Sequence, residues 1–143
     1  EKIARRLSEQ RPAGMPALNV LIQVNVSGET SKSGIAPAEA AALADAVSKL
    51  PRLRLRGLMA IPEPTRDAAL QRLRLSELKR LLQQLQEQHP ALDTLSMGMS
   101  DDMEAAIAEG ATMVRVGTAI FGARSSSGGT GLPPAPPMQK SAA

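Results

Sequence analysis

Two kinds of segment alternate along the chain, short apolar runs and longer runs with apolar positions at helical spacing. Four runs are rich in aliphatic and β-branched residues: 18–26 (LNVLIQVNV), 53–61 (LRLRGLMAI), 92–99 (LDTLSMGM) and 112–116 (TMVRV). Nearly continuous apolar runs of this length are typical of parallel strands that are buried on both faces. We therefore predict four strands.

The segments between these strands predict helices. Residues 38–50 are alanine-rich and follow Pro37, which a first helical turn tolerates. Residues 67–88 form the longest helical pattern, and residues 1–10 predict a short helix at the start. Ser100 is expected to cap a helix over 101–109, and Gly110 to end it. One side of the helix over 67–88 is expected to carry Leu70, Leu73, Leu78, Leu81, Leu82 and Leu85.

The resulting order, a helix followed by β-α-β-α-β-α-β, predicts an α/β fold with a parallel sheet and helices outside it. Such folds place their sites at the carboxyl ends of the strands. Polar groups gather there: Asn25 with the loop 27–34, Ser100, and the segment from Arg115 to Thr118. Met59 and Met99 are expected to fill the core beside them.

The amino-acid composition excludes several classes of functional site. The chain has no cysteine, which excludes disulfide scaffolds, thiolate metal sites and cysteine nucleophiles. With His89 as the single histidine, a His-based metal site is not expected, and Phe121 is the only aromatic residue. No apolar run approaches the roughly 20 residues of a membrane helix, and residues 1–10 do not read as a signal peptide, so a cytoplasmic protein is expected. Residues 125–143 (SSSGGTGLPPAPPMQKSAA) predict a disordered tail after a single domain over 1–124.

Candidate chemistry concentrates in residues 113–122 (MVRVGTAIFG). Arg115 precedes Gly117 by two residues, and no Asp or Glu lies between Met113 and Arg124. A cation beside a glycine at a strand end can hold a phosphorylated ligand, because the backbone approaches an oxyanion closely there. The alternative is a buried last strand whose arginine pairs with a carboxylate. These ten residues leave both interpretations open.

Three longer segments resemble the pyridoxal phosphate homeostasis family, known as YggS in bacteria and PROSC in animals. They are residues 21–35 (LIQVNVSGETSKSGI), 51–64 (PRLRLRGLMAIPEP) and 95–124 (LSMGMSDDMEAAIAEGATMVRVGTAIFGAR). The resemblance implies a (β/α)8 barrel of TIM type similar to the cofactor domain of alanine racemase. It also implies binding of pyridoxal 5′-phosphate (PLP), no catalytic activity of its own, and a role in buffering the cofactor or delivering it to PLP-dependent apoenzymes.

Carried onto this sequence, the resemblance implies four cofactor-binding residues and no catalytic or metal-binding ones. Arg115 is expected to face the pyridine nitrogen of PLP. Gly117 and Thr118 are expected to donate to the phosphate from the backbone, and Ser100 to reach the same phosphate from the neighbouring strand end. Arginine keeps its proton near neutral pH, so the ring nitrogen stays an unprotonated acceptor, which suits storage better than amino-acid chemistry.

The sequence departs from the family in length. Its strands correspond to the fifth to eighth of the barrel, a carboxy-terminal half of about four β/α units, without the segment that carries the Schiff-base lysine. Lys2, Lys32, Lys49, Lys79 and Lys140 lie on helix surfaces, in the loop 27–34 or in the tail, so none is expected to replace it. The amino-terminal half-barrel or a second chain would complete the fold. In isolation, weak binding through the phosphate alone is expected.

Two other functions stay open. A fragment of a fold-type III PLP enzyme such as an amino-acid racemase would need an acid/base tyrosine or cysteine, and this chain has neither. A structural fragment with a vestigial phosphate site is the other. Nucleic acid is not an expected partner, although Arg52, Arg54 and Arg56 alternate along one strand, because no aromatic residues stand among them to stack on bases.

Overall fold

The computed structural model describes residues 1–28 and 33–122 of the chain. Three parallel strands form one sheet in the order β1-β2-β3: β1 (Leu18–Gln23), β2 (Leu53–Met59) and β3 (Thr94–Ser96). The first crossover holds η1 (Pro37–Glu39) and α2 (Ala40–Ser48), and the second holds α3 (Ala68–Gln86). Helix α1 (Lys2–Gln10) precedes the sheet, and α4 (Met103–Ala108) and α5 (Thr118–Phe121) follow it. The predicted α/β class with a parallel sheet is confirmed.

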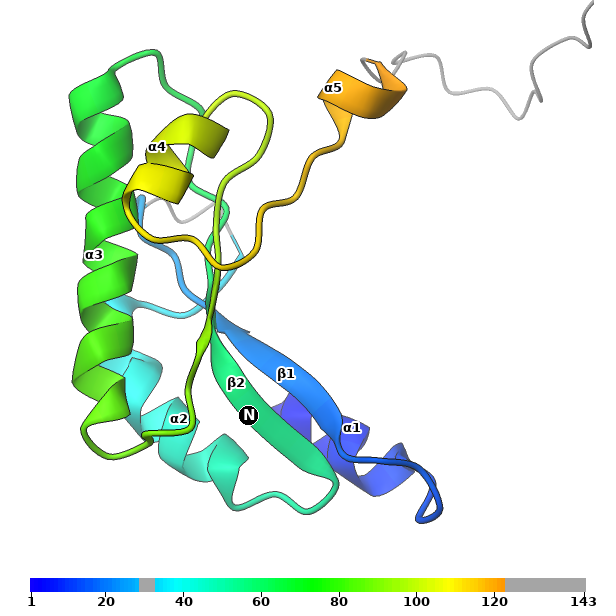
Figure 1. Ribbon diagram of the computed structural model, residues 1–143. Helices are drawn as coiled ribbons and strands as arrows, with labels where there is room; N and C mark the ends of the chain where they lie inside the picture. Colours follow the sequence, from blue (N-terminus) through cyan, green and yellow to red (C-terminus); the bar gives the residue numbers. More distant parts are fainter. Residues whose placement is uncertain (29–32, 123–143) are drawn as a thin grey trace, which may run out of the picture.

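Helices α2, α3 and α4 lie on one side of the strands, and α5 stands apart from them at the end of an extended segment (Figure 1). The core lies between the sheet and these helices. Its largest fully buried apolar side chains are Val24, Leu58, Leu75, Leu78, Leu95 and Met97. Helix α3 buries residues three and four apart, as one face of an amphipathic helix does: Leu75, Leu78, Leu82 and Leu85. The prediction that Leu73 belongs to this face is wrong, since Leu73 is 64% exposed.

A register shift between β1 and β2 centres on Arg56 and Gly57. Val20 pairs with Leu55, but Leu21 pairs with Gly57, so Arg56 is the extra residue of a bulge. A Cβ at Gly57, whose φ is +156°, would overlap the carbonyl of Thr94 on β3. Only glycine therefore lets β2 and β3 approach this closely.

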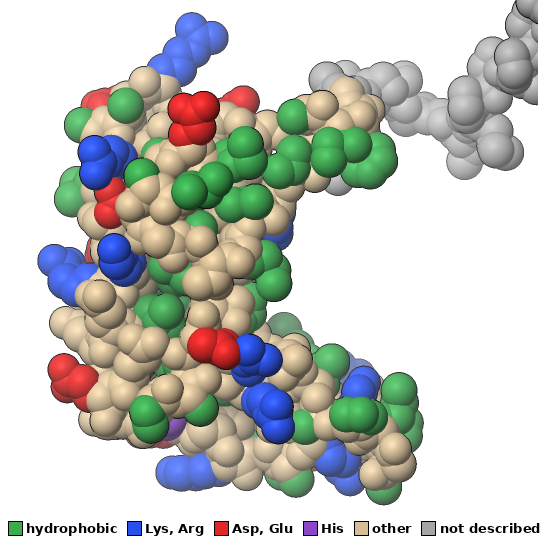
Figure 2. All heavy atoms as spheres, viewed as in Figure 1, with side chains coloured by type: hydrophobic (Ala, Val, Ile, Leu, Met, Phe, Trp, Pro, Cys, Tyr) green, Lys and Arg blue, Asp and Glu red, His purple; other side chains and the backbone are tan. Residues whose placement is uncertain are grey.

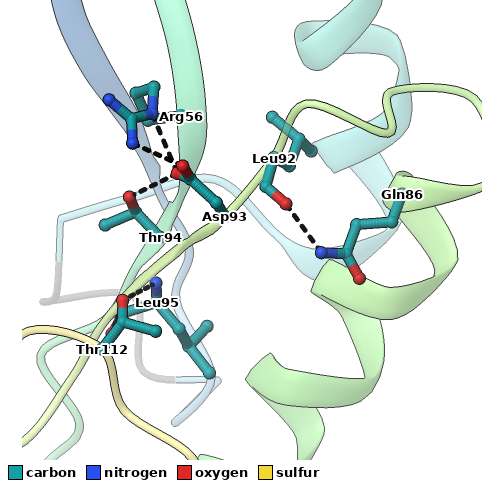
Figure 3. A network of polar contacts seen from close by, with 7 residues as sticks. All are labelled: Arg56, Gln86, Leu92, Asp93, Thr94, Leu95 and Thr112. Atoms are coloured by element: carbon teal, nitrogen blue, oxygen red, sulfur yellow. Dashed lines mark hydrogen bonds and ion pairs between the residues drawn. The ribbon is translucent and has the colours of Figure 1, made fainter.

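The side chain of Arg56 pairs with Asp93, the residue that leads into β3 (Figure 3). Arg56 Nε lies 2.8 Å from Asp93 Oδ1, and the Thr94 hydroxyl donates to the same oxygen at 2.8 Å. The guanidinium of Arg56 and this hydroxyl hold the pKa of Asp93 below its usual value. The pair joins the start of β3 to the middle of β2.

The amino end of β2 holds α1 in place. The Ser8 side chain, 2% exposed, donates to the carbonyl of Pro51, and Arg52 Nε donates to the carbonyl of Ser8 at 2.7 Å. Arg52 has a φ of +63°, a conformation uncommon for a side chain of this size. Of the three alternating arginines, Arg52 thus donates to the carboxyl end of α1 and Arg56 pairs with Asp93. Arg54, between them, is exposed.

The strands are shorter than predicted. Strand β1 ends at Gln23. The Val24 amide still donates to the Met59 carbonyl of β2 at 2.8 Å, whereas the Asn25 amide donates to the Ile35 carbonyl in the returning loop at 2.8 Å. Residues 112–116 form no strand, which corrects the fourth prediction: their regular pairing is the single bridge between Ser96 and Met113. Gly98, at a φ of +93°, turns the chain away from extended geometry two residues after β3 ends.

The cap predicted for Ser100 is also wrong. Helix α4 begins at Met103, and it is the Asp102 carboxylate that accepts a hydrogen bond from the Met99 amide, at 2.6 Å. Met99 is 43% exposed rather than core, whereas Met59 is half-buried. The predicted tail, 125–143, lies outside the described residues.

Within the described residues the sheet is open. Strand β1 pairs with β2 alone, and beyond β3 lies only the Met113 bridge. The barrel geometry therefore stays a prediction. None of the helices that the structure describes has both the length and the apolar character required to cross a bilayer.

Candidate functional site

Arg115 lies over the carboxyl ends of β2 and β3. Its amide donates to the Gly98 carbonyl at 2.9 Å, which holds the backbone beside the end of β3. Its guanidinium reaches back along the sheet: Nη1 donates to the Ser96 carbonyl at 3.1 Å and to the Ser96 hydroxyl at 2.5 Å, and Nη2 donates to the Ala60 carbonyl at 2.8 Å. Three acceptors on two neighbouring strand ends therefore fix one half-buried cation.

No carboxylate of the described residues pairs with the Arg115 guanidinium. Its three acceptors are neutral, and it takes part in none of the ion pairs between described residues. The alternative of an arginine paired with a carboxylate is thus not what the described residues show. A guanidinium has more N–H donors than these acceptors use. Arg115 can therefore donate to a further acceptor while it stays bound to the sheet.

Gly117 and Thr118 follow directly and begin the short α5. The Gly117 carbonyl accepts from the amides of Ile120 and Phe121, each at 2.9 Å. A Cβ built at Gly117 meets no atom within 4 Å, so space is open on that side of the backbone. The backbone of Thr118 belongs to α5, and its side chain is not among the described parts.

Ser100 lies beside this segment. Its hydroxyl accepts a hydrogen bond from the Ala119 amide at 3.3 Å. Together with the bond from Arg115 to Gly98, this contact places residues 98–100 alongside residues 115–119. The four predicted residues thus stand on two adjacent segments at one end of the sheet. The Arg115 guanidinium points back over Ser96 and Ala60, whereas Ser100 contacts the start of α5.

A cavity of about 780 Å³ lies next to these segments, between the loop after β2 and the loop after β3. Its lining includes Glu63, Arg66, Arg74, Met99, Asp101 and Asp102. Arg74 is already engaged, since Nη2 lies 3.1 Å from Glu63 Oε2 and Nη1 donates to the Glu63 carbonyl at 3.1 Å. The lining brings three carboxylates against two arginines, one of which is already paired with Glu63, so this cavity does not favour a phosphate.

The lysines of the described chain offer no buried amine. Lys2 and Lys49 are exposed, and Lys79 is half-buried on α3. Lys32 and Lys140 lie outside the described residues. In the ranges 1–28 and 33–122, no cluster of three His, Cys, Asp or Glu side chains could hold a metal ion.

Ser96 was missed by the sequence reasoning. It is 2% exposed and carries two of the three acceptors that hold Arg115. The signal was a polar residue between Leu95 and Met97, which both belong to the core. Because successive side chains of a strand point to opposite faces, Ser96 had to face away from that core.

Comparison with known proteins adds relatives that bear on this site. Residues 1–125 match the family described as "Alanine racemase, N-terminal domain". A protein of Pseudomonas aeruginosa named pyridoxal phosphate homeostasis protein is 68% identical over 123 residues, which cover 86% of this chain and 52% of the relative. The protein of the same name in Vibrio cholerae is 60% identical over 124 residues, covering 87% and 52%. The chain thus spans about half the length of these curated relatives.

Solved structures agree with the fold. A protein of Bifidobacterium adolescentis superposes with a TM-score of 0.78 at 40% identity, over 84% of this chain and 49% of that one. PipY of Synechococcus elongatus, solved with PLP bound, superposes with a TM-score of 0.66 at 33% identity, over 85% of this chain and 53% of PipY.

Proposed function

This chain belongs to the alanine racemase N-terminal domain family, and we propose that it binds pyridoxal 5′-phosphate and serves intracellular PLP homeostasis without catalysing a reaction. The observation that carries the proposal is the Arg115 guanidinium, fixed by neutral acceptors at the ends of β2 and β3 and unpaired with any described carboxylate. A cation with donors to spare suits an anionic ligand that also carries a ring acceptor.

Arg115 would hold the cofactor ring. A donor that keeps its proton near neutral pH favours an unprotonated pyridine nitrogen, because the nitrogen can then only accept. PLP supplies an electron sink when its ring is protonated, and an unprotonated ring is a poorer one. The absence of tyrosine and cysteine from the sequence supports the non-catalytic role, since a racemase of this type would need one of them as acid or base.

Ser100, Gly117 and Thr118 would hold the phosphate. Space is open beside Gly117, and the Ser100 hydroxyl lies on the adjacent segment, where it accepts from the Ala119 amide. Backbone amides and a hydroxyl are the usual neutral donors to a phosphate oxygen. Asp101 and Asp102, which follow Ser100, line the neighbouring cavity.

We further propose that the sheet is the carboxy-terminal half of a (β/α)8 barrel. The open edges of the sheet support this, as do large apolar side chains that no described residue covers: Met99, Met113, Ile120 and Phe121, exposed by 43 to 85%. Figure 2 shows apolar side chains gathered on α5, above a hollow in the surface. Exposed apolar area of this kind marks a surface that another part of a protein covers. PLP-dependent apoenzymes would be the recipients of the cofactor.

The proposal is tested by titrating the 143-residue chain with PLP and with pyridoxal, which lacks the phosphate, and following near-ultraviolet absorbance. Saturable binding of PLP, weaker binding of pyridoxal and competition by inorganic phosphate are expected. Arg115→Ala should weaken PLP binding by about tenfold or more, as loss of a charge-assisted contact does. The matched control is Arg54→Ala, on an exposed strand position. No saturable binding, or equal losses in both variants, would refute the proposal.

A further inference from the structure

Described residues at the ends of two strands orient the Arg115 guanidinium. All three of its acceptors lie on the ends of β2 and β3, and two of them belong to Ser96. The carbonyls of Ser96 and Ala60 are backbone atoms, fixed by the sheet. The Ser96 hydroxyl is therefore the one side-chain group among these acceptors, and a substitution can remove it without touching the backbone.

The hydroxyl of Ser96 sets which N–H groups of Arg115 remain available. It lies 2.5 Å from Nη1, while Nη2 is held 2.8 Å from the Ala60 carbonyl. The three hydrogen bonds on the two terminal nitrogens together hinder rotation of the planar guanidinium about its last bond. Without the hydroxyl, Nη1 would keep only the Ser96 carbonyl at 3.1 Å, so the guanidinium would be held more weakly and would rotate faster.

We propose that Ser96 is a positioning residue for Arg115, so that recognition of the cofactor ring is built into this half of the fold. The role rests on the proposed function for the identity of the ligand. If Arg115 binds the cofactor ring, the chain should bind PLP more tightly than inorganic phosphate, whereas binding through the phosphate alone would give similar affinities. The difference between the two affinities should depend on Ser96, although no hydrogen bond between described residues joins Ser96 to the proposed phosphate site.

The partner of the Ser96 hydroxyl, the Arg115 guanidinium, favours this role over a general structural one. Ser96 is 2% exposed, and its neighbours in the chain, Leu95 and Met97, fill the core on the opposite face. Ser8 offers a matched comparison: it is equally buried and its hydroxyl donates to the Pro51 carbonyl at the far end of β2. Loss of either hydroxyl should cost similar stability, but only that of Ser96 should affect Arg115.

The test uses the 143-residue chain labelled with ¹⁵N-arginine. The Nη–H signals of Arg115 are assigned by their loss in Arg115→Lys. They should be individually resolved in the parent and in Ser8→Ala. In Ser96→Ala they should merge as rotation becomes fast, and in Ser96→Thr, which restores a hydroxyl, they should separate again. Ser96→Cys keeps the shape of the side chain, although sulfur is larger than oxygen, and offers only a weak acceptor, so it should behave as Ser96→Ala and serves if the alanine variant does not fold.

Titration supplies the second readout. Ser96→Ala should lower the affinity for PLP about tenfold and leave the affinity for inorganic phosphate unchanged, whereas Ser8→Ala should change neither. Ser96→Ala signals that stay resolved, or an unchanged ratio of PLP to phosphate affinity, would overturn the role of Ser96. A parent chain that binds no PLP would overturn the proposed function instead, and the arginine signals would still decide whether Ser96 orients Arg115.

Discussion

The Ser100 hydroxyl accepts a hydrogen bond from the backbone amide of Ala119, 3.3 Å away. The two residues are separated by α4 and by the segment that carries Arg115. Their contact links the loop after β3 to the start of α5. It thereby brings a hydroxyl next to Gly117, where the backbone is open on one side.

Ser100→Ala should weaken binding of inorganic phosphate and of PLP by a similar factor, about three- to tenfold, because it removes one neutral donor to the phosphate. Isothermal titration measures both affinities. Ser48→Ala is the control, since the Ser48 hydroxyl only donates to the Asp45 carbonyl within its own helix turn. A loss confined to PLP would show that Ser100 does not serve the phosphate.

Gly117→Val should abolish phosphate binding while the fold survives. A Cβ at Gly117 meets nothing within 4 Å, and its φ is not in the left-handed region, so valine fits the free protein and obstructs only a ligand. Phosphate titration with circular dichroism separates the two effects. Gly14→Val provides the comparison, because a Cβ there also meets nothing within 4 Å. Undiminished binding by Gly117→Val would place the phosphate elsewhere.

Asp93→Asn should make stability less dependent on pH. The pKa of Asp93 is lowered in the folded chain by Arg56 and Thr94. Its contribution is therefore present above the unfolded value, about 4, and is lost as the pH falls through the folded one. Urea unfolding at pH 7 and pH 3 should show a smaller difference in Asp93→Asn than in the parent. Asp101→Asn, on an exposed loop, should retain the parental difference.

Leu78→Ala and Leu73→Ala test the buried face of α3. Leu78 is fully buried, whereas Leu73 is 64% exposed on the same helix. Leu78→Ala should lower the free energy of unfolding by about 2–5 kcal/mol, because it leaves a cavity in the core. Leu73→Ala should change it by less than about 0.5 kcal/mol. Comparable losses in urea denaturation would mean that Leu73 is covered in solution.

Much of the fold was predictable because burial leaves a local pattern. The apolar runs that became β1, β2 and β3 and the amphipathic pattern that became α3 each reflect which side of one element faces the core. The family was recognisable from three longer segments, residues 21–35, 51–64 and 95–124. Arg115 was expected in a strand over 112–116, which the structure lacks, but the guanidinium does lie at the ends of β2 and β3.

The partners of these residues were settled only by the tertiary structure. Local pattern could not show that Ser100 contacts Ala119 rather than capping α4, or that the Asn25 amide, just after β1, donates to the Ile35 carbonyl. Nor could it show that Ser96 and Ala60 hold Arg115, 19 and 55 residues away along the chain. Periodicity reports whether a side chain is buried, whereas the choice of partner depends on which strand ends the sheet brings together.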